Sequence, residues 1–362
     1  MTLCQFTIHS ALNWNYFENQ VVLSPKLKEA TLAMMKAFHH DIKRTELLFS
    51  RHDNIRRALI DFFISTLYAT YEVIGMKTST EIASAAKLIG EERAVEAYAR
   101  AGFDAWDFSM FDMCCYDWET NSVKPSTHPL ASGEALTLAR RLKQIGLDNG
   151  IHCNQSHAPF PSDCPPIRDH LKLAIECTAE AGGAICVIHP ANLRSAQENA
   201  DMYCELLPFA KACGVKIATE NMWCWDNDKD QCCFAACATP QSFLEHLELV
   251  NDPDFVACLD LGHAEMRGLG TSAPEMIRAL GSHLQALHIH DNDQWHDSHQ
   301  IPFSMQIPFS PIIQALKDVD YQGYFTLEAD QYLSAYTPET ITQGIAKLAE
   351  AAQRFEELFT KV

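Results

Sequence analysis

The sequence has no long hydrophobic run, few basic residues and no recognisable nucleotide-binding loop. None of its apolar stretches approaches the roughly 20 residues that a membrane-spanning helix needs. The first ten residues, MTLCQFTIHS, lack the basic flank and apolar run of a secretory signal. Lys and Arg number 28 against 47 Asp and Glu, and the net charge of −19 repels nucleic-acid backbones. We therefore expect a cytoplasmic protein without membrane or nucleic-acid partners.

Cysteine is not scarce, because the chain has 14, but no two of them form a CxxC pair. Zinc-ribbon and thioredoxin-like structures therefore have no support. Several cysteines, among them Cys177, Cys186 and Cys258, fall inside predicted core elements. We expect reduced, buried thiols in a reducing compartment.

From Ile74 onward, strand-like and helix-like segments alternate along the chain. Short apolar runs typical of buried parallel strands occur at 76–80, 105–109, 150–154, 184–189, 216–220, 256–260, 286–290 and 324–328. Glycines that favour helix ends, Gly102, Gly146 and Gly182, follow three of the helical patterns. Eight alternations predict a (β/α)8 TIM barrel. A doubly wound sheet is the alternative, but no GxGxxG or GxxxxGK(S/T) loop follows an early strand.

Residues 1–75 do not follow this alternation and are mostly helical in pattern. They contain 8 Lys and Arg and 7 Asp and Glu, a charge near +1, which leaves about −20 for the remainder. We expect a separate helical extension before a barrel of residues 76–362. A cap or a dimerisation arm would suit it, so a homo-oligomer stays open.

Side chains of metal-ligand type follow four of the predicted strands. Glu220 ends KIATE, Asp260 and His263 lie in CLDLGHA, His290 lies in ALHIHD, and Glu328 lies in YFTLEAD. The carboxyl ends of barrel strands meet at one mouth, so these side chains are expected to converge there. Oxygen and imidazole donors around one point suit a divalent cation.

His288 shares a strand face with His290 but lies further from the predicted strand end, so we expect it to pack or to support the ligands. His263 is open to binding a second ion, contacting substrate or capping its loop. A further set can bind another ion or substrate oxygens, or can be ordinary core and loop residues: His157 in QSHAPF, His189 in VIHP, and Asp297 and His299 in HDSHQIP.

Two tryptophans, Trp223 and Trp225, alternate with Cys224 directly after Glu220. Their rings are suited to stacking on the C–H face of a sugar and to closing off the site. Packing against a neighbouring loop or subunit is the alternative.

At these motifs the chain resembles the xylose-isomerase-like barrel superfamily, which holds sugar isomerases and epimerases alongside endonuclease IV. The resemblance runs from about residue 76 to the end, and SHAPF, ENM, LDLGHA, HIHDND with the following DSH, and YFTLE carry it. Similarity to ketose 3-epimerases implies one divalent ion at Glu220, Asp260, His290 and Glu328. It also implies that His263 contacts substrate. The epimerases' substrate-binding Arg is not evident, and His296 lies at about its place.

Similarity to endonuclease IV implies a larger set that binds three zinc ions. The matching additional residues are His157, His189, His263, Asp297 and His299. However, the gap from His290 to Asp297 is shorter than in the nuclease, and the chain lacks its basic DNA-gripping loops.

We therefore expect a metal-dependent sugar isomerase or epimerase that uses Mn, Co, Zn or Mg, with room for more than one ion, on a sugar or sugar phosphate. Glu220 and Glu328 would form the acid/base pair that moves a proton next to a carbonyl through an enediolate. The alternatives are an endonuclease IV-like multi-zinc phosphodiester hydrolase, a dehydratase or lyase on a sugar-derived ketone, and a non-catalytic sugar-binding barrel.

Overall fold

The computed structural model describes residues 76–361, and all eight strands predicted from the sequence are present. The strands are β1 (Thr78–Thr80), β2 (Ala105–Ser109), β5 (His152–His157), β6 (Ile185–Val187), β7 (Lys216–Glu220), β10 (Phe255–Asp260), β11 (Leu284–His288) and β12 (Phe325–Leu327). Residues 1–75, for which a helical extension was predicted, lie outside the described part.

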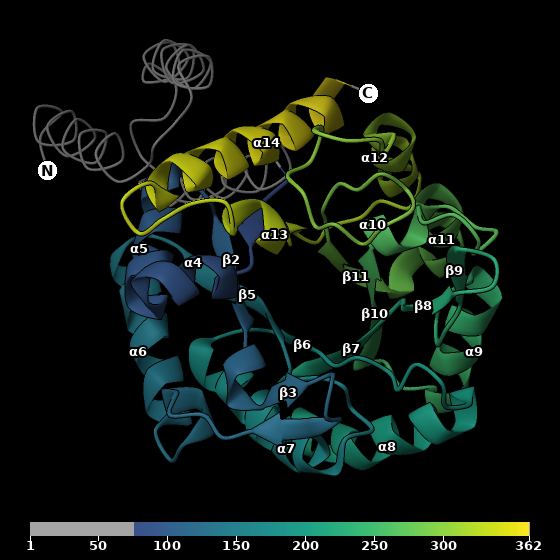
Figure 1. The fold of residues 1–362 in the computed structure, drawn as a ribbon, viewed down its shortest axis with the longest axis horizontal. Helices are drawn as coiled ribbons and strands as arrows, with labels where there is room; N and C mark the ends of the chain where they lie inside the picture. The colour runs from purple at the N-terminus through teal and green to yellow at the C-terminus, as the bar shows by residue number, and fades with distance from the viewer. Residues whose placement is uncertain (1–75, 362) are drawn as a thin grey trace, which may run out of the picture. The chain divides into compact units, whose positions relative to one another are not determined.

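These strands form a closed parallel barrel (Figure 1). Six of them pair in the order β11-β10-β7-β6-β5-β2, and β1 pairs with β12. Two parallel bridges close the ring, one between Glu81 and Asp107 and the other between Ile289 and Leu327. The predicted TIM barrel is therefore confirmed, and the carboxyl ends of all eight strands face the same mouth.

Helices surround the strands, as Figure 1 shows. The longer ones are α5 (Glu91–Ala101), α6 (Ala135–Asp148), α7 (Pro165–Ala181), α8 (Ala196–Cys213), α9 (Pro240–Val250), α11 (Ala273–Leu280), α12 (Phe309–Asp318) and α14 (Ile341–Lys361). Short helices are α4 (Ala83–Ile89), α10 (Leu261–Ala264) and α13 (Asp330–Leu333), with 3-10 turns at Phe111–Met113, Pro129–Ala131 and Gly281–His283. No helix in residues 76–361 is long and apolar enough to cross a membrane.

Alternation along the strands separates the outer core from the barrel interior. On β7, Ile217 belongs to the large apolar cluster between strands and helices, whereas Ala218 belongs to a small separate cluster. Leu259 and Cys258 divide in the same way on β10. Since successive side chains point to opposite faces, residues two positions apart share a face. The next residue on the interior face is Glu220 after Ala218, and Asp260 after Cys258. The pattern therefore aims these carboxylates into the mouth.

Two antiparallel hairpins lie outside the barrel sheet and were not predicted. They are β3 (Cys115–Asp117) with β4 (Ser122–Lys124), and β8 (Trp223–Asp226) with β9 (Gln231–Phe234). The second one carries Trp223 and Trp225, so it fixes the direction of the aromatic side chains next to Glu220.

The prediction that three glycines end helices is confirmed for two of them. Gly102 and Gly182 have the left-handed conformation at the ends of α5 and α7. Gly146 was predicted wrongly, because it lies inside α6 and is buried. A Cβ there would meet the Ile151 carbonyl oxygen and Trp106 Nε1 at 3.0 Å, so glycine permits close packing of the helix against β2 and the chain before β5.

Candidate metal and active site at the barrel mouth

The predicted ligands lie at the carboxyl ends of their strands. Glu220 is the last residue of β7, Asp260 is the last of β10, and Glu328 directly follows β12. All three are buried, with at most 6% of the residue exposed. The barrel thus brings three acidic side chains from distant parts of the chain to one buried place.

His288, the last residue of β11, completes this group of four. Ligand atoms of Glu220, Asp260, His288 and Glu328 all lie within 4.8 Å of one another. His288 Nδ1 is 3.0 Å from Glu220 Oε1 and 3.3 Å from Glu328 Oε2. We call these four residues the central group.

The central group differs from the predicted set in its histidine. His290 was predicted as the ligand, with His288 in a packing or supporting role. In the structure β11 ends at His288, so His288 stands level with the other strand ends, and His290 lies beyond it. His290 still touches the central group, with Nε2 3.1 Å from Asp260 Oδ1. Its other neighbours belong to a second group.

The second group contains His263, His290, Asp297 and His299. Asp297 holds it together: Oδ2 is 3.2 Å from His263 Nε2, and Oδ1 is 3.1 Å from His299 Nε2 and 3.4 Å from His290 Nε2. The rings of His290 and His299 stack with centroids 3.9 Å apart. The predicted additional ligands on the loop after β11 therefore converge beside Asp260.

A third group contains His157, His189 and Glu220. The Nε2 atoms of the two histidines face each other at 2.7 Å, and His189 Nε2 is 3.2 Å from Glu220 Oε2. His157 Nδ1 also lies 3.2 Å from Glu328 Oε1. Phe160 stacks on both rings, with centroids 5.7 Å from His157 and 4.7 Å from His189. Glu220 thus belongs to two adjoining groups.

Electrostatics make the central group a candidate cation site. Burial raises the pKa of Glu328 well above its usual range. The pKa of Glu220 lies well below its usual range. Burial alone would raise this pKa, but the charges of His288 and His189 outweigh the effect of burial. Glu220 Oε2 and Asp260 Oδ2 are buried without a hydrogen bond. Buried carboxylates need a compensating positive charge, and three oxygen donors with one imidazole fit a divalent cation.

Two supporting residues were not singled out from the sequence. Asp107 on β2 places Oδ2 3.4 Å from His288 Nε2 and accepts a 2.9 Å hydrogen bond from Gln155 Nε2. Asn221 exchanges two hydrogen bonds with the backbone of Asp260, at 2.7 and 2.9 Å. A carboxylate behind a histidine fixes which ring nitrogen faces a metal. The available signal for Asp107 was a lone charge inside the buried strand AWDFS.

The predicted aromatic wall is assembled at the edge of the site. Trp223 Nε1 donates a 3.1 Å hydrogen bond to Asp297 Oδ2, and Trp225 stacks on His296 with centroids 6.1 Å apart. A cavity of about 340 Å³ is lined by Trp223, Trp225, Trp295, His296 and Asp297. Trp295 was not predicted; it completes what we call the tryptophan pocket.

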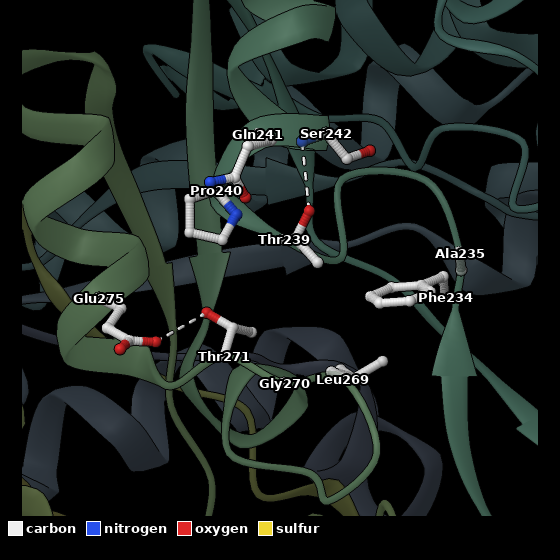
Figure 2. A pocket seen from close by; sticks show the side chains of 10 residues that line it. All are labelled: Phe234, Ala235, Thr239, Pro240, Gln241, Ser242, Leu269, Gly270, Thr271 and Glu275. Carbon is white, nitrogen blue, oxygen red and sulfur yellow. Dashed lines mark hydrogen bonds between the residues drawn. The ribbon is translucent and has the colours of Figure 1, made fainter.

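A larger hollow of about 660 Å³ lies elsewhere, at the start of α9 (Figure 2). Its walls are Phe234, Ala235, Thr239, Pro240, Gln241, Ser242, Leu269, Gly270, Thr271 and Glu275. Thr239 Oγ1 caps the helix by accepting from Ser242 N, and Thr271 Oγ1 donates to Glu275 Oε2. None of the predicted ligands lines this hollow.

The fold and this arrangement of side chains define a TIM barrel with a buried carboxylate–histidine site at the carboxyl ends of its strands. A family model described as xylose isomerase-like TIM barrel matches residues 95–354, and the chain belongs to that family. An uncharacterised protein of Methanocaldococcus jannaschii is 26% identical over 254 residues, which are 65% of this chain and 78% of that protein.

Solved structures give the same fold. A D-tagatose 3-epimerase-like protein superposes with a TM-score of 0.59 at 19% identity, covering 79% of this chain and 99% of that one. A D-psicose 3-epimerase from Clostridium cellulolyticum H10, solved with D-tagatose, gives a TM-score of 0.56 at 17% identity and the same coverage.

Proposed function

We propose that this protein is a divalent-metal-dependent sugar isomerase or epimerase. The observation that carries the proposal is the central group, where two buried glutamates from β7 and the end of β12 flank one histidine and one aspartate. The relatives of known structure that are described as sugar 3-epimerases support the same class of reaction. A binding protein has no need of two buried carboxylates facing each other.

Glu220, Asp260, His288 and Glu328 would hold the cation, with Mn, Co, Zn or Mg all suited to this mixed donor set. When bound, such an ion supplies Lewis acidity that makes the C–H next to a carbonyl easier to ionise. The second and third groups leave room for more than one ion.

The two glutamates carry the proton chemistry in this proposal. One carboxylate, Glu220 or Glu328, removes the proton from the carbon next to the substrate carbonyl, and the other returns a proton. Return to the opposite face of that carbon gives epimerisation, whereas return to the neighbouring carbon gives aldose–ketose isomerisation. His288, between the two carboxylates at 3.0 and 3.3 Å, fixes their separation. Burial of the mouth residues excludes water from the reacting carbon.

A multi-zinc phosphodiester hydrolase of the endonuclease IV type is the second candidate. Three adjoining groups favour it, because the central and third groups share Glu220 and the second group meets the central group at Asp260. The net charge of −19 opposes a DNA substrate. A dehydratase or lyase on a sugar-derived ketone begins with the same proton abstraction and is tested by its products.

The remaining expectations follow from this class of enzyme. The partner would be a small sugar or sugar phosphate, rather than nucleic acid or a membrane. A cytoplasmic location fits the described cysteines, which are all free. Two further expectations stay predictions: that the protein forms a homo-oligomer, and that residues 1–75 form a helical extension.

The test combines metal analysis with a substrate screen. Purified protein is analysed for bound metals, and the metal-loaded form is assayed on a panel of ketoses, their phosphates and abasic-site DNA. Glu220→Gln and Glu328→Gln keep the side-chain shape but remove the base, so each is expected to lower turnover by at least roughly 10²-fold. Glu275→Gln, at the hollow away from the mouth, is the matched control and keeps full activity. Near-normal turnover of both mouth variants would overturn the assignment, and cleavage of abasic DNA without sugar turnover would favour the hydrolase.

A further inference from the structure

We propose that the tryptophan pocket is a subsite for a second sugar ring, so that the substrate is a disaccharide or glycoside rather than a free monosaccharide. The inference rests on the proposed function for the ring that reacts at the central group. The subsite would hold the remainder of the substrate, and its side chains would recognise that part.

The pocket has the composition of a carbohydrate subsite. Three indole rings, Trp223, Trp225 and Trp295, line a cavity of about 340 Å³, and His296 and Asp297 supply polar edges. Indole faces pack against the C–H face of a sugar ring, whereas carboxylate and imidazole groups accept and donate hydrogen bonds to its hydroxyls. Trp295 is 37% exposed, so part of this wall is accessible from solvent.

The walls are held in place before any ligand arrives. Trp223 and Trp225 lie on β8, which pairs with β9 in a regular antiparallel register. Asp293 Oδ1 accepts hydrogen bonds from the backbone N–H groups of Trp295 and His296 at 2.8 and 2.7 Å. A wall fixed by backbone contacts loses little conformational entropy on binding, which favours affinity.

The pocket lies next to the proposed catalytic groups. Asp297 lines the pocket and also contacts His290, whose Nε2 lies 3.1 Å from Asp260 Oδ1 in the central group. The Trp223 ring centroid is 6.5 Å from that of His263. Only two side-chain contacts therefore separate the pocket from the central group, and this closeness supports one molecule with two linked rings reaching both.

Local charge favours a neutral ring over an anionic group. The carboxylate of Asp297 lines the pocket. Asp293 lies behind Trp295 and His296. The nearby cation, Arg267, is placed over the Trp295 ring at 5.0 Å from its centroid. A phosphate would face the Asp297 carboxylate, whereas uncharged hydroxyls would not be repelled.

Binding to the metal-loaded protein tests this subsite without requiring turnover. Calorimetric titrations with cellobiose, phenyl β-D-glucoside and methyl β-D-glucoside compare a second sugar ring, an aromatic ring and no second ring. Cellobiose is expected to bind about tenfold more tightly than methyl glucoside, as one to two stacking contacts allow. Trp295→Ala and Trp225→Ala should each remove most of that preference. Trp118→Ala, which changes an exposed tryptophan near the β3–β4 hairpin, is the matched control and keeps it.

Unchanged metal content and circular dichroism would show that the variants fold. Equal affinity for cellobiose and methyl glucoside, or a preference confined to the phenyl glycoside, would overturn the proposal, as would full retention of the preference in both pocket variants. If the preference behaves as expected while no ketose, free or within a disaccharide or glycoside, undergoes proton exchange, the subsite stands and the proposed reaction fails.

Discussion

His288 and His290 occupy the same face of one strand path, two residues apart, yet they serve different groups. His288 lies between Glu220 and Glu328, whereas His290 stacks on His299 and contacts Asp297. Sequence spacing predicted that both point inward, because strand side chains alternate. It did not predict which one is level with the carboxylates, since that depends on where β11 ends relative to β7 and β12.

The two histidines should therefore affect metal binding differently. His288→Asn removes a proposed ligand of the central group, and we expect the affinity of the tightest divalent site to fall at least roughly tenfold. His290→Asn should leave that site intact and reduce any further binding equivalents. Competition with a chelating dye, after metal removal and reloading, measures both. A larger loss at the tightest site in His290→Asn than in His288→Asn would restore His290 as the central ligand.

At the scale of elements, strands were easier to predict than the hairpins that shape the mouth. The strands read as short apolar runs with small interior residues, as in KIATE and FVACLD. The β8 and β9 strands are half-buried, antiparallel and outside the barrel sheet, so WCWD and QCCF show no alternation of apolar and polar residues. The tryptophan pocket depends on this hairpin, and therefore only its residue types could be predicted.

In helix α6, the close packing around Gly146 opposes the higher helix propensity of alanine, and a substitution can show which effect is larger. Alanine ordinarily stabilises a helix interior relative to glycine by up to about 1 kcal/mol. At Gly146 the added Cβ would press on the Ile151 carbonyl and on Trp106, and overpacking of this kind costs about 1–3 kcal/mol. Gly146→Ala is therefore expected to lower the free energy of unfolding, measured by urea titration. Gly133→Ala, where nothing lies within 4 Å of the new Cβ, should change it little. Stabilisation by Gly146→Ala would contradict the packing described here.

At the scale of the whole molecule, barrel closure buries an acid that the proposed chemistry does not use. Glu81 follows β1 where the chain bridges to Asp107 on β2, and only 3% of it is exposed. Burial raises the pKa of Glu81 from 4.5 to about 7, although hydrogen bonds from Ser84 oppose the shift. The folded barrel therefore keeps a proton that the unfolded chain has already released above pH 4.5.

This difference predicts a pH dependence of stability. Between pH 4.5 and about 7 the folded state binds more protons than the unfolded state, so the free energy of unfolding falls as the pH rises. The full loss is about 3 kcal/mol once Glu81 is ionised. Urea unfolding is measured at pH 5 and pH 8 with a chelator present. The free energy of unfolding of Glu81→Gln, relative to that of the natural protein, should increase between these two pH values. A difference that is constant with pH would show that Glu81 is charged in the fold.

At this scale, the sequence predicted the fold and those site residues whose positions follow from strand order and barrel geometry. A closed parallel barrel must bring Glu220, Asp260 and Glu328 to the same mouth, whatever the connecting helices do. The position of Asp297 and His299 depends on the path of a loop, and loop paths follow from contacts that a single sequence does not display. Their residue types could be chosen from the sequence, but their partnership with His263 and His290 could not.

The most direct measurement is proton exchange with solvent. Metal-loaded protein is incubated in deuterated water with a panel of ketoses and of disaccharides and glycosides that contain a ketose, and deuterium at the carbon next to the carbonyl is followed by NMR. The account predicts incorporation into at least one sugar by the natural protein, and its loss in both Glu220→Gln and Glu328→Gln. Absence of deuterium from every sugar, or equal incorporation by both variants, would contradict it.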